Sequence, residues 1–239
     1  MEIFARSELL LGEKAMERLQ KAHVAVFGVG GVGATCCEAL CRGGVGKLTF
    51  IDPDAVSKTN INRQLVALHS TIGRNKAEVM KERALDINPN AQITVHTVFY
   101  SAENAADFPL TDYDFVVDCI DTVASKLLLI ETAHKQNVPI ISALGAGNKQ
   151  DPTLFRIADI YDTKVCPLAR VLRSKLKKMG IPHHLTVYSE EVPMEPLAAL
   201  EEKGRHLPGS LSFVPPVMGM ILAGEVIKRL VFPPENGQI

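Results

Sequence analysis

A glycine-rich segment and a later acidic residue have the spacing of a nucleotide-binding loop. Gly28, Gly30 and Gly33 form the pattern G-x-G-x-x-G, and Gly31 adds a fourth glycine inside it. In this pattern, backbone N–H groups can approach phosphate oxygens where a helix begins. Asp52 follows 24 residues after Gly28, where a carboxylate can accept hydrogen bonds from ribose hydroxyls. The pattern predicts nucleotide binding, and the alternative is that these glycines serve only close helix–strand packing.

A second group of side chains places fixed cations and further polar groups after the acidic residue. It comprises Asp54, Asn60, Arg63, Gln64 and Lys76. Hydride transfer to a nicotinamide needs no neutralisation of a triphosphate, whereas attack on the α-phosphate of ATP develops negative charge that Arg and Lys stabilise. The sequence therefore favours adenylation over dehydrogenation.

Asp121 lies in the segment Asp118-Cys-Ile-Asp-Thr122, directly after another expected strand. Ligands bind at this edge of doubly wound sheets, and one carboxylate together with substrate phosphates is a common arrangement for Mg²⁺. We therefore expect Asp121 to hold Mg²⁺ and, with Arg63 and Lys76, to act in catalysis. The alternatives are that Asp121 caps the next helix and that the two cations are solvated surface charges.

Alternating apolar and amphipathic segments predict the fold that positions these residues. Expected helices cover residues 8–20, 33–42, 73–87, 125–136, 168–179 and 217–230, and expected strands cover 23–27, 47–51, 92–99, 115–119, 139–143 and 185–189. This alternation predicts an α/β, Rossmann-like, doubly wound fold: a mostly parallel sheet with helices on both faces and a C-terminal extension. We expect a single domain over residues 1–239, with a nucleotide-binding core in 20–160 and a substrate and dimerisation section in 161–239.

Composition excludes several classes of protein. The chain has 239 residues, of which 46% are hydrophobic and 22% charged, and its formal net charge is −1. Bulk charge therefore cannot hold a nucleic acid, and any polyanion must meet a local basic patch. Charges interrupt both residues 1–20 and the most apolar stretch, 213–232. They argue against an export signal and a membrane span, and we expect a cytoplasmic protein.

The five cysteines predict neither a disulfide framework nor a structural zinc site, because their number is odd and no C-x-x-C pair occurs. Cys36, Cys37 and Cys41 are expected in the core. For Cys166 we weigh a reactive thiol beside Lys164 against a structural role.

A basic segment runs from residue 164 to 178 without any acidic residue, and apolar side chains recur in it at helical spacing. One helix face would then pack while the other presents cations, a plausible footprint for a phosphate backbone. We expect its contacts from Arg170, Arg173, Lys175, Lys177 and Lys178, extended by the pair His183-His184. A merely solvated helix is the alternative.

Over residues 5–160 these motifs resemble the adenylating enzymes related to ubiquitin-activating, molybdopterin-synthase-activating and thiazole-pathway proteins. The resemblance rests on the segments 28–33, 51–54, 60–64 and 118–122 and on Lys76. It implies that Asp52 binds the ribose, that Asn60, Arg63 and Lys76 bind the phosphates, and that Asp121 binds Mg²⁺–ATP.

Within that family, segments 142–153, 167–170, 188–191 and 209–215 resemble the tRNA threonylcarbamoyladenosine dehydratases. The resemblance implies a tRNA substrate and ATP-dependent cyclisation of a modified adenosine beside the anticodon. The threonyl carboxylate would be adenylated, and the ureido group of the same nucleoside would then attack it and expel AMP. We also expect a homodimer formed through the apolar C-terminal helix. Whether a Na⁺ or K⁺ ion binds near the loop 145–147 is left open by the sequence.

Two other functions remain open at this point. One is activation of a ubiquitin-like sulfur-carrier protein, which usually needs a trapping cysteine, and Cys166 is the candidate. The other is a nucleotide-binding partner of a sulfur-transfer protein that does not catalyse. The presence of Arg63, Lys76 and Asp121 argues against that second alternative.

Overall fold

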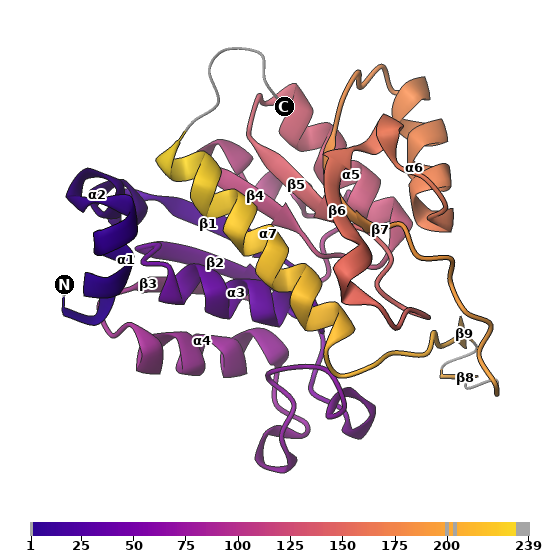
Figure 1. The fold of residues 1–239 in the computed structure, drawn as a ribbon, viewed down its shortest axis with the longest axis horizontal. Coiled ribbons are helices and arrows are strands. Elements are labelled where there is room, and N and C mark those ends of the chain that lie inside the picture. Colours follow the sequence, from indigo (N-terminus) through magenta and orange to yellow (C-terminus); the bar gives the residue numbers. More distant parts are fainter. Residues whose placement is uncertain (1, 199–200, 203–204, 233–239) are drawn as a thin grey trace.

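A seven-stranded sheet forms the centre of the molecule in the computed structural model, which describes residues 2–198, 201–202 and 205–232 (Figure 1). The strand order is β3-β2-β1-β4-β5-β7-β6, and every neighbouring pair is parallel except β6 and β7. The strands are β1 (His23–Phe27), β2 (Lys47–Ile51), β3 (Gln92–His96), β4 (Phe115–Asp118), β5 (Ile140–Ala143), β6 (Phe155–Asp159) and β7 (Leu185–Ser189). The predicted mostly parallel sheet is confirmed.

Helices cover both faces of this sheet, because successive side chains of a strand point to opposite sides. In β1, Val24 and Val26 enter one apolar cluster with α2, α3, α4 and α7, whereas Ala25 and Phe27 enter a second cluster with α5 and α6. The helices are α1 (Ala5–Leu11), α2 (Glu13–Lys21), α3 (Gly33–Arg42), α4 (Lys76–Ile87), α5 (Val123–Lys135), α6 (Pro167–Lys178) and α7 (Val214–Val231). Two short strands, β8 (Glu201–Glu202) and β9 (Arg205–His206), form a separate pair.

Two predicted elements differ from the structure, and one strand was not predicted. The helix expected over 8–20 is divided at Gly12, whose φ of 84° ends α1 before α2 begins. The strand expected over 92–99 ends at His96, and the chain then turns towards the cavity described below. Strand β6 was not predicted, because an antiparallel edge strand that is half exposed lacks the continuous apolar run of the central strands.

The C-terminal part of the chain completes this core. Strand β7 lies between β5 and β6, and α7 crosses one face of the sheet against α3 (Figure 1). At their contact, a Cβ on Gly219 would lie 2.3 Å from the carbonyl oxygen of Val32, so only glycine lets the two backbones approach this closely. Most apolar side chains of α7 are therefore buried within the chain itself, although Met220 is 52% exposed.

The three cysteines of α3, Cys36, Cys37 and Cys41, are fully buried, as predicted. All five cysteines are free thiols. In the described part of the chain, no helix is both long enough and apolar enough to cross a membrane.

Candidate functional site

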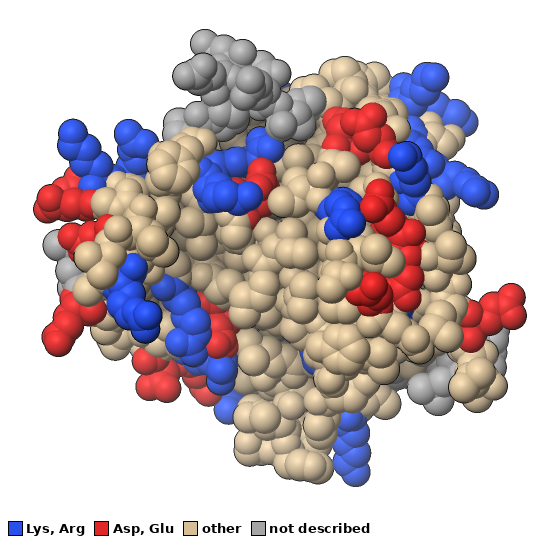
Figure 2. All heavy atoms as spheres, in the orientation of Figure 1, with Lys and Arg blue, Asp and Glu red and all other residues tan. Residues whose placement is uncertain are grey.

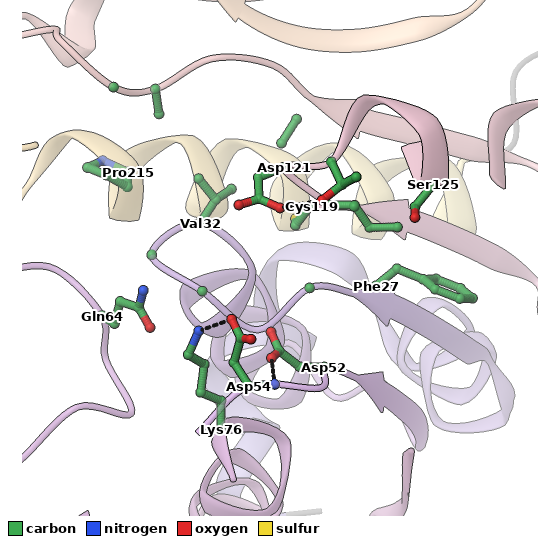
Figure 3. A pocket seen from close by; sticks show the side chains of 18 of the residues that line it. Phe27, Val32, Asp52, Asp54, Gln64, Lys76, Cys119, Asp121, Ser125 and Pro215 are labelled. Carbon is green, nitrogen blue, oxygen red and sulfur yellow. Dashed lines mark hydrogen bonds and ion pairs between the residues drawn. The ribbon is translucent and has the colours of Figure 1, made fainter. Parts of the chain in front are cut away.

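A cavity of about 540 Å³ opens at the carboxyl ends of the parallel strands (Figure 3). This is the edge at which doubly wound sheets bind ligands. Loops that follow β1, β2, β4 and β5 form its walls. Among the residues predicted for the site, those that line the cavity are Gly28, Gly30, Gly31, Asp52, Asp54, Arg63, Gln64, Lys76 and Asp121. Residues from five separate segments of the chain are thus brought together.

The glycine-rich loop divides two roles among its members. Gly28 has a φ of 92°, and a Cβ there would lie 2.6 Å from the carbonyl oxygen of Cys119. A Cβ on Gly33 would lie 1.8 Å from the carbonyl oxygen of Gly28, so Gly33 serves helix packing, and it is not among the residues that line the cavity. Gly30 and Gly31 do line it. Gly28 therefore both packs closely and lines the cavity, whereas Gly33 serves packing alone. Nucleotide binding at Gly30 and Gly31 stays a prediction.

Asp52 ties this loop to the end of β2. Its Oδ2 accepts a hydrogen bond from the N–H of Val29 at 2.6 Å, and its Oδ1 accepts one from the N–H of Asp54 at 2.8 Å. Burial raises the pKa of this carboxyl group, while the charge of Lys76 and the two N–H donors act in the opposite direction. The arrangement fixes the carboxylate at the cavity wall, where a ribose hydroxyl can reach it.

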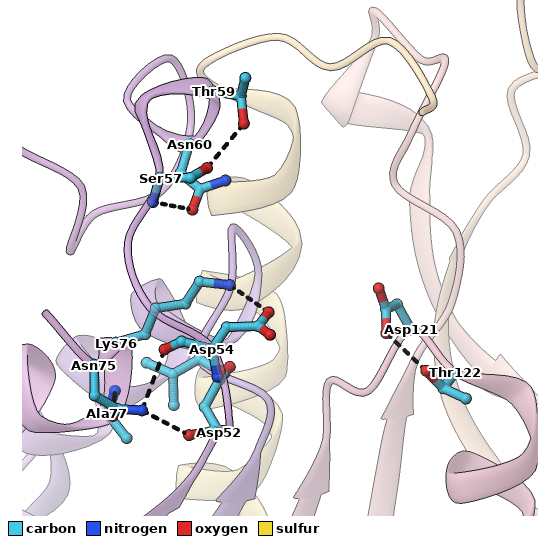
Figure 4. Close-up of polar contacts among 11 residues, drawn as sticks. Asp52, Asp54, Ser57, Thr59, Asn60, Asn75, Lys76, Ala77, Asp121 and Thr122 are labelled. Carbon is cyan, nitrogen blue, oxygen red and sulfur yellow. Dashed lines mark hydrogen bonds and ion pairs between the residues drawn. The ribbon is translucent and has the colours of Figure 1, made fainter. Parts of the chain in front are cut away.

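Lys76 supplies a buried cation to the cavity. The Asn75 side chain caps α4 by accepting from the N–H of Ala77 at 2.9 Å, which places Lys76 in the first turn of the helix. Its Nζ donates to Asp54 Oδ2 at 2.8 Å, and although the Lys76 side chain is buried, that of Asp54 is 65% exposed (Figures 3 and 4). The cation is thus held in place by a partner that solvent can reach.

Arg63 approaches the loop from the segment between β2 and α4. Its Nη1 donates to the carbonyl oxygen of Thr59 at 2.9 Å and to Asn62 Oδ1 at 2.8 Å. A Cβ on Gly31 would lie 3.6 Å from Arg63 Cγ, so the arginine stem lies against the glycine-rich loop. Arg63 and Lys76 therefore border the same cavity.

The neighbouring polar residues of this segment are placed differently. Gln64 is buried and lines the cavity, and its Oε1 has no hydrogen-bond partner among the described residues. Asn60 does not line the cavity. Its Oδ1 accepts from the N–H of Ser57 at 3.0 Å and caps a short turn (Figure 4). Asn60 thus shapes the segment that carries Arg63, and its contact with phosphate stays a prediction.

Asp121 faces this group from the other side of the cavity (Figure 3). It is exposed, and its Oδ1 accepts a hydrogen bond from Thr122 Oγ1 at 3.2 Å. Thr122, not Asp121, occupies the position before α5, and no side chain caps this helix. The structure therefore does not support the alternative in which Asp121 is a helix cap.

A buried polar chain, not predicted from the sequence, lies behind Asp121. Ser142 Oγ donates to Asp118 Oδ2 at 2.6 Å, and His184 Nε2 lies 2.8 Å from Ser142 Oγ. The Ser142 hydroxyl already donates its hydrogen to Asp118, so its oxygen can only accept from His184, and the Nε2–H of His184 is the donor. His184 Nδ1 faces His134 Nε2 at 3.4 Å. Burial lowers the pKa of His184 and so favours the neutral ring.

Stability is expected to fall as the pH is lowered because of this histidine. Burial, His134, Lys126 and His183 hold the pKa of His184 well below 6.5. Below pH 6.5 the unfolded chain binds a proton that the folded chain does not, so the free energy of unfolding should fall by up to about 1.4 kcal/mol per pH unit. Denaturant unfolding between pH 7.5 and 5 measures this slope. His184→Gln should flatten it, whereas exposed His69→Gln should leave it unchanged; an equal slope in all three proteins contradicts the prediction.

The cavity has two walls that sequence reasoning missed. One is apolar and comprises Val98, Phe99 and Tyr100, held by Ser125 Oγ, which donates to the carbonyl oxygen of Tyr100 at 2.6 Å. Its position after a parallel strand is the signal that could have revealed it. The other wall contains Pro208 and Ser210.

The wall at Pro208 and Ser210 depends on two asparagines from distant segments. Asn148 Oδ1 accepts from the N–H of Gly209 at 2.6 Å, and Asn62 Nδ2 donates to the carbonyl oxygen of Ser210 at 2.9 Å. These contacts join the motifs 142–153 and 209–215, and no local pattern in the sequence predicts that they meet.

The basic helix α6 begins beside the cavity, because Leu168 in its first turn lines it. Arg170, Lys175, Lys177 and Lys178 are exposed, whereas Arg173 is partly buried and donates to the carbonyl oxygen of Thr163. The expectation that both histidines extend the cationic surface is wrong for His184, which is 1% exposed and whose pKa is lowered by burial. Cys166 is also buried, at 3% exposed, and does not line the cavity.

Comparison with known proteins agrees with this geometry. The model of the ThiF family matches residues 4–238. The chain belongs to the ThiF family. Among its relatives, the tRNA threonylcarbamoyladenosine dehydratase of Bacillus subtilis is 41% identical over 95% of this chain and 94% of its own length. The Escherichia coli protein of that name is 42% identical over 73% of this chain and 65% of its own length.

Solved structures extend the comparison within the ThiF family. Crystal structures of E. coli tRNA N6-threonylcarbamoyladenosine dehydratase, TcdA, in complex with AMP and with ATP match with a TM-score of 0.87 and 34% identity. The match covers 96% of this chain and at least 93% of the other. The ATP complex of E. coli MccB, with a TM-score of 0.69 at 20% identity, shares the fold alone.

Proposed function

We propose that this ThiF-family protein catalyses ATP-dependent dehydration of N6-threonylcarbamoyladenosine in tRNA, next to the anticodon. One observation carries the proposal: Asp52, Arg63, Lys76 and Asp121 surround one cavity in a chain 41% identical to a named dehydratase along nearly its whole length. The crystal structures of TcdA with ATP and AMP support the choice of nucleotide.

The reaction balances without an enzyme-bound acyl group. A carboxylate oxygen of the threonyl group attacks the α-phosphorus of ATP, and the bond to pyrophosphate breaks. The ureido group of the same nucleoside then attacks the activated carbonyl carbon, loses a proton and expels AMP, so the nucleoside loses one water in total. The nucleophile is tethered to the electrophile, which makes this step effectively unimolecular.

Each residue has a defined part in the proposed site. The N–H groups at Gly30 and Gly31 border the phosphates, Asp52 accepts from the ribose, and the apolar wall 98–100 packs against the base. Arg63 and Lys76 stabilise charge that develops on the α-phosphate. Asp54 holds Lys76, and Gln64 offers its unpartnered amide oxygen to the ligand.

Two cations complete the proposed site. The exposed carboxylate of Asp121 on the cavity wall fits Mg²⁺, which is bound through one or two carboxylates and substrate phosphates. Mg²⁺ there would neutralise phosphate charge. A Na⁺ or K⁺ ion would take backbone carbonyl oxygens of the loop 145–147, which also lines the cavity.

The exposed cations of α6 are proposed to bind the tRNA backbone. Figure 2 shows Lys and Arg side chains over α6 at the upper right of the molecule. The Lys175→Ala/Lys178→Ala variant should reduce the log–log salt slope of tRNA binding by about one unit for each phosphate that is no longer neutralised. Filter binding at several salt concentrations measures this slope. Lys14→Ala/Lys21→Ala on α2 is the matched control, and an equal slope in both variants removes α6 from the tRNA surface.

Cys166 distinguishes this function from activation of a sulfur-carrier protein. Part of the chain is 34% identical to the adenylyltransferase and sulfurtransferase UBA4 of Candida glabrata, over 60% of this chain and 33% of that protein. A buried thiol outside the cavity is poorly placed to trap an acyl group. Cys166→Ser should therefore keep its rate of AMP formation with modified tRNA. A covalent adduct on Cys166 would favour the sulfur-carrier alternative and a sulfur-transfer partner.

We further propose a cytoplasmic protein that acts as one domain over residues 1–239, with nucleotide contacts in 20–160 and substrate contacts in 161–239. A homodimer is part of this proposal. Exposed Leu9 and Leu10 of α1, at 86% and 87%, and Met220 of α7 are apolar surface that a second copy would cover. Sedimentation velocity measures the oligomeric state.

Nucleoside mass spectrometry of tRNA tests the central proposal. Cells that lack the protein should retain threonylcarbamoyladenosine and lose the nucleoside lighter by one water. Re-expression should restore the lighter nucleoside, and Asp121→Asn should restore it poorly. Normal amounts of the lighter nucleoside in the deleted strain would exclude the proposed activity.

A further inference from the structure

A fully buried ion pair joins the carboxyl ends of β4 and β5. Lys126 Nζ donates to Asp118 Oδ2 at 2.6 Å and to the carbonyl oxygen of Ala143 at 3.0 Å. Both charged side chains are 0% exposed. Asp118 is the last residue of β4, Ala143 is the last of β5, and Lys126 lies in the first turn of α5. One ammonium group therefore holds two strand ends at a fixed separation.

Each strand end leads directly into a wall of the cavity. The other oxygen of Asp118, Oδ1, accepts from the N–H of Ile120 at 3.0 Å, one residue before Asp121. On the other side, Ala143 precedes the loop 144–147. Residues 119–122 and 143–147 all line the cavity. The ion pair thus joins two segments that line the cavity, and one of them carries Asp121, which faces Asp54 and Lys76 (Figure 3).

Stability alone does not explain two charges in this place. Removing a carboxylate and an ammonium from water costs several kcal/mol per ion, and apolar residues of similar volume are often as stable or more stable. The adjoining part of this face of the sheet is apolar: Val116 and Ile140 are buried in the cluster that includes α5. A geometric requirement at the neighbouring loops is the better explanation for the retained charges.

We propose that Lys126 is a positioning residue that, through Asp118 and Ala143, sets the Asp121 carboxylate at the distance from the loop 144–147 that Mg²⁺–ATP and the acyl substrate require. This inference rests on the proposed function, in which Asp121 acts on Mg²⁺–ATP. Lys126 itself makes no contact with the reacting atoms. Partners that orient a metal-binding group typically contribute a factor of about 10–100 in metal affinity or activity.

The test replaces the pair by neutral residues of similar volume, Asp118→Asn/Lys126→Met. The asparagine oxygen retains an acceptor for the N–H of Ile120, while the variant removes both buried charges and the hydrogen bond to Ala143. The Mg²⁺ concentration for half-maximal AMP formation should rise by about 10-fold or more, while KM for ATP should change little, because Asp52, Lys76 and the glycine-rich loop are untouched. A merely smaller folded fraction would lower kcat without moving the Mg²⁺ half-saturation point. If the double variant does not fold, Asp118→Asn/Lys126→Gln replaces it, because this pair also leaves no buried charge without a counter-charge.

Two controls make the result specific. Ser142→Ala breaks the hydrogen bond to Asp118 from the other side and keeps Lys126 in place, so its Mg²⁺ half-saturation point should match that of the unchanged protein. A double-mutant cycle with Asp121→Asn should be non-additive, because the pair acts only through that carboxylate.

An unchanged Mg²⁺ half-saturation point, or additive effects in the cycle, overturns the inference. The proposed function fails separately, if the unchanged protein forms no AMP from ATP and modified tRNA.

Discussion

Alanine at Arg63 or Lys76 is expected to lower kcat for AMP formation by about 10²–10³-fold and to change KM for ATP much less. Each cation gains interaction as charge develops on the α-phosphate, so its removal weighs more on the transition state than on bound ATP. The Lys76 variant should still fold, because the partner it leaves, Asp54, has a side chain 65% exposed to water. Single-turnover kinetics under saturating ATP measures the effect.

Arg74 provides a matched control for these two cations. It lies two residues before Lys76, it is paired with Glu82 on the surface, and it does not line the cavity. Arg74→Ala should keep the unchanged rate, since a surface ion pair contributes little. Wild-type turnover in both the Arg63 and Lys76 variants would show that neither cation acts on the α-phosphate.

Lys126→Met alone is expected to destabilise the protein by about 3–5 kcal/mol, because it leaves the Asp118 carboxylate buried without its cation. Asp118 is 0% exposed, and its remaining donors are the Ser142 hydroxyl and the N–H of Ile120. Chemical denaturation at pH 7.5 measures the decrease in the free energy of unfolding.

The neutral pair Asp118→Asn/Lys126→Met supplies the comparison for this stability change. It should recover much of the free energy of unfolding, since no buried charge is then left without a counter-charge. Surface Lys135→Met, which breaks a pair with Glu131 whose lysine is 70% exposed, should cost far less. A Lys126→Met protein as stable as the unchanged chain would refute the expected penalty.

Much of the fold followed from local patterns in the sequence. Buried strands such as β1 and β5 are short apolar runs in the sequence, which is typical of a parallel sheet. The glycine pattern after β1 indicated the edge at which the cavity opens. Gly33 shows the limit of such a motif, because its lack of a side chain serves packing against Gly28 and not the cavity. The spacing of a motif predicts which residues come together. Which of them line the cavity and which serve packing depends on the three-dimensional structure.

Contacts between distant segments could not be predicted in the same way. In the sequence, His184 follows the basic segment 164–178 and was expected to extend its cationic surface. In the structure its ring is buried against Ser142, which comes from another strand. Asn148 and Gly209 are 61 residues apart and meet through the loop after β5. Such pairings depend on the packing of the whole sheet, and a single sequence carries no periodic signal for them.

The close approach of α7 to α3 at Gly219 has a consequence for folding during synthesis, because α7 is made long after α3. The contact joins residue 219 to Val32 and Cys36, at the beginning of the helix that follows the glycine-rich loop. When only β1, α3 and β2 have been synthesised, the apolar surface of α3 that later packs against α7 is still uncovered. The α3 surface that packs against α7 therefore stays exposed until α7 has been synthesised, and apolar surface exposed in this way is prone to aggregation.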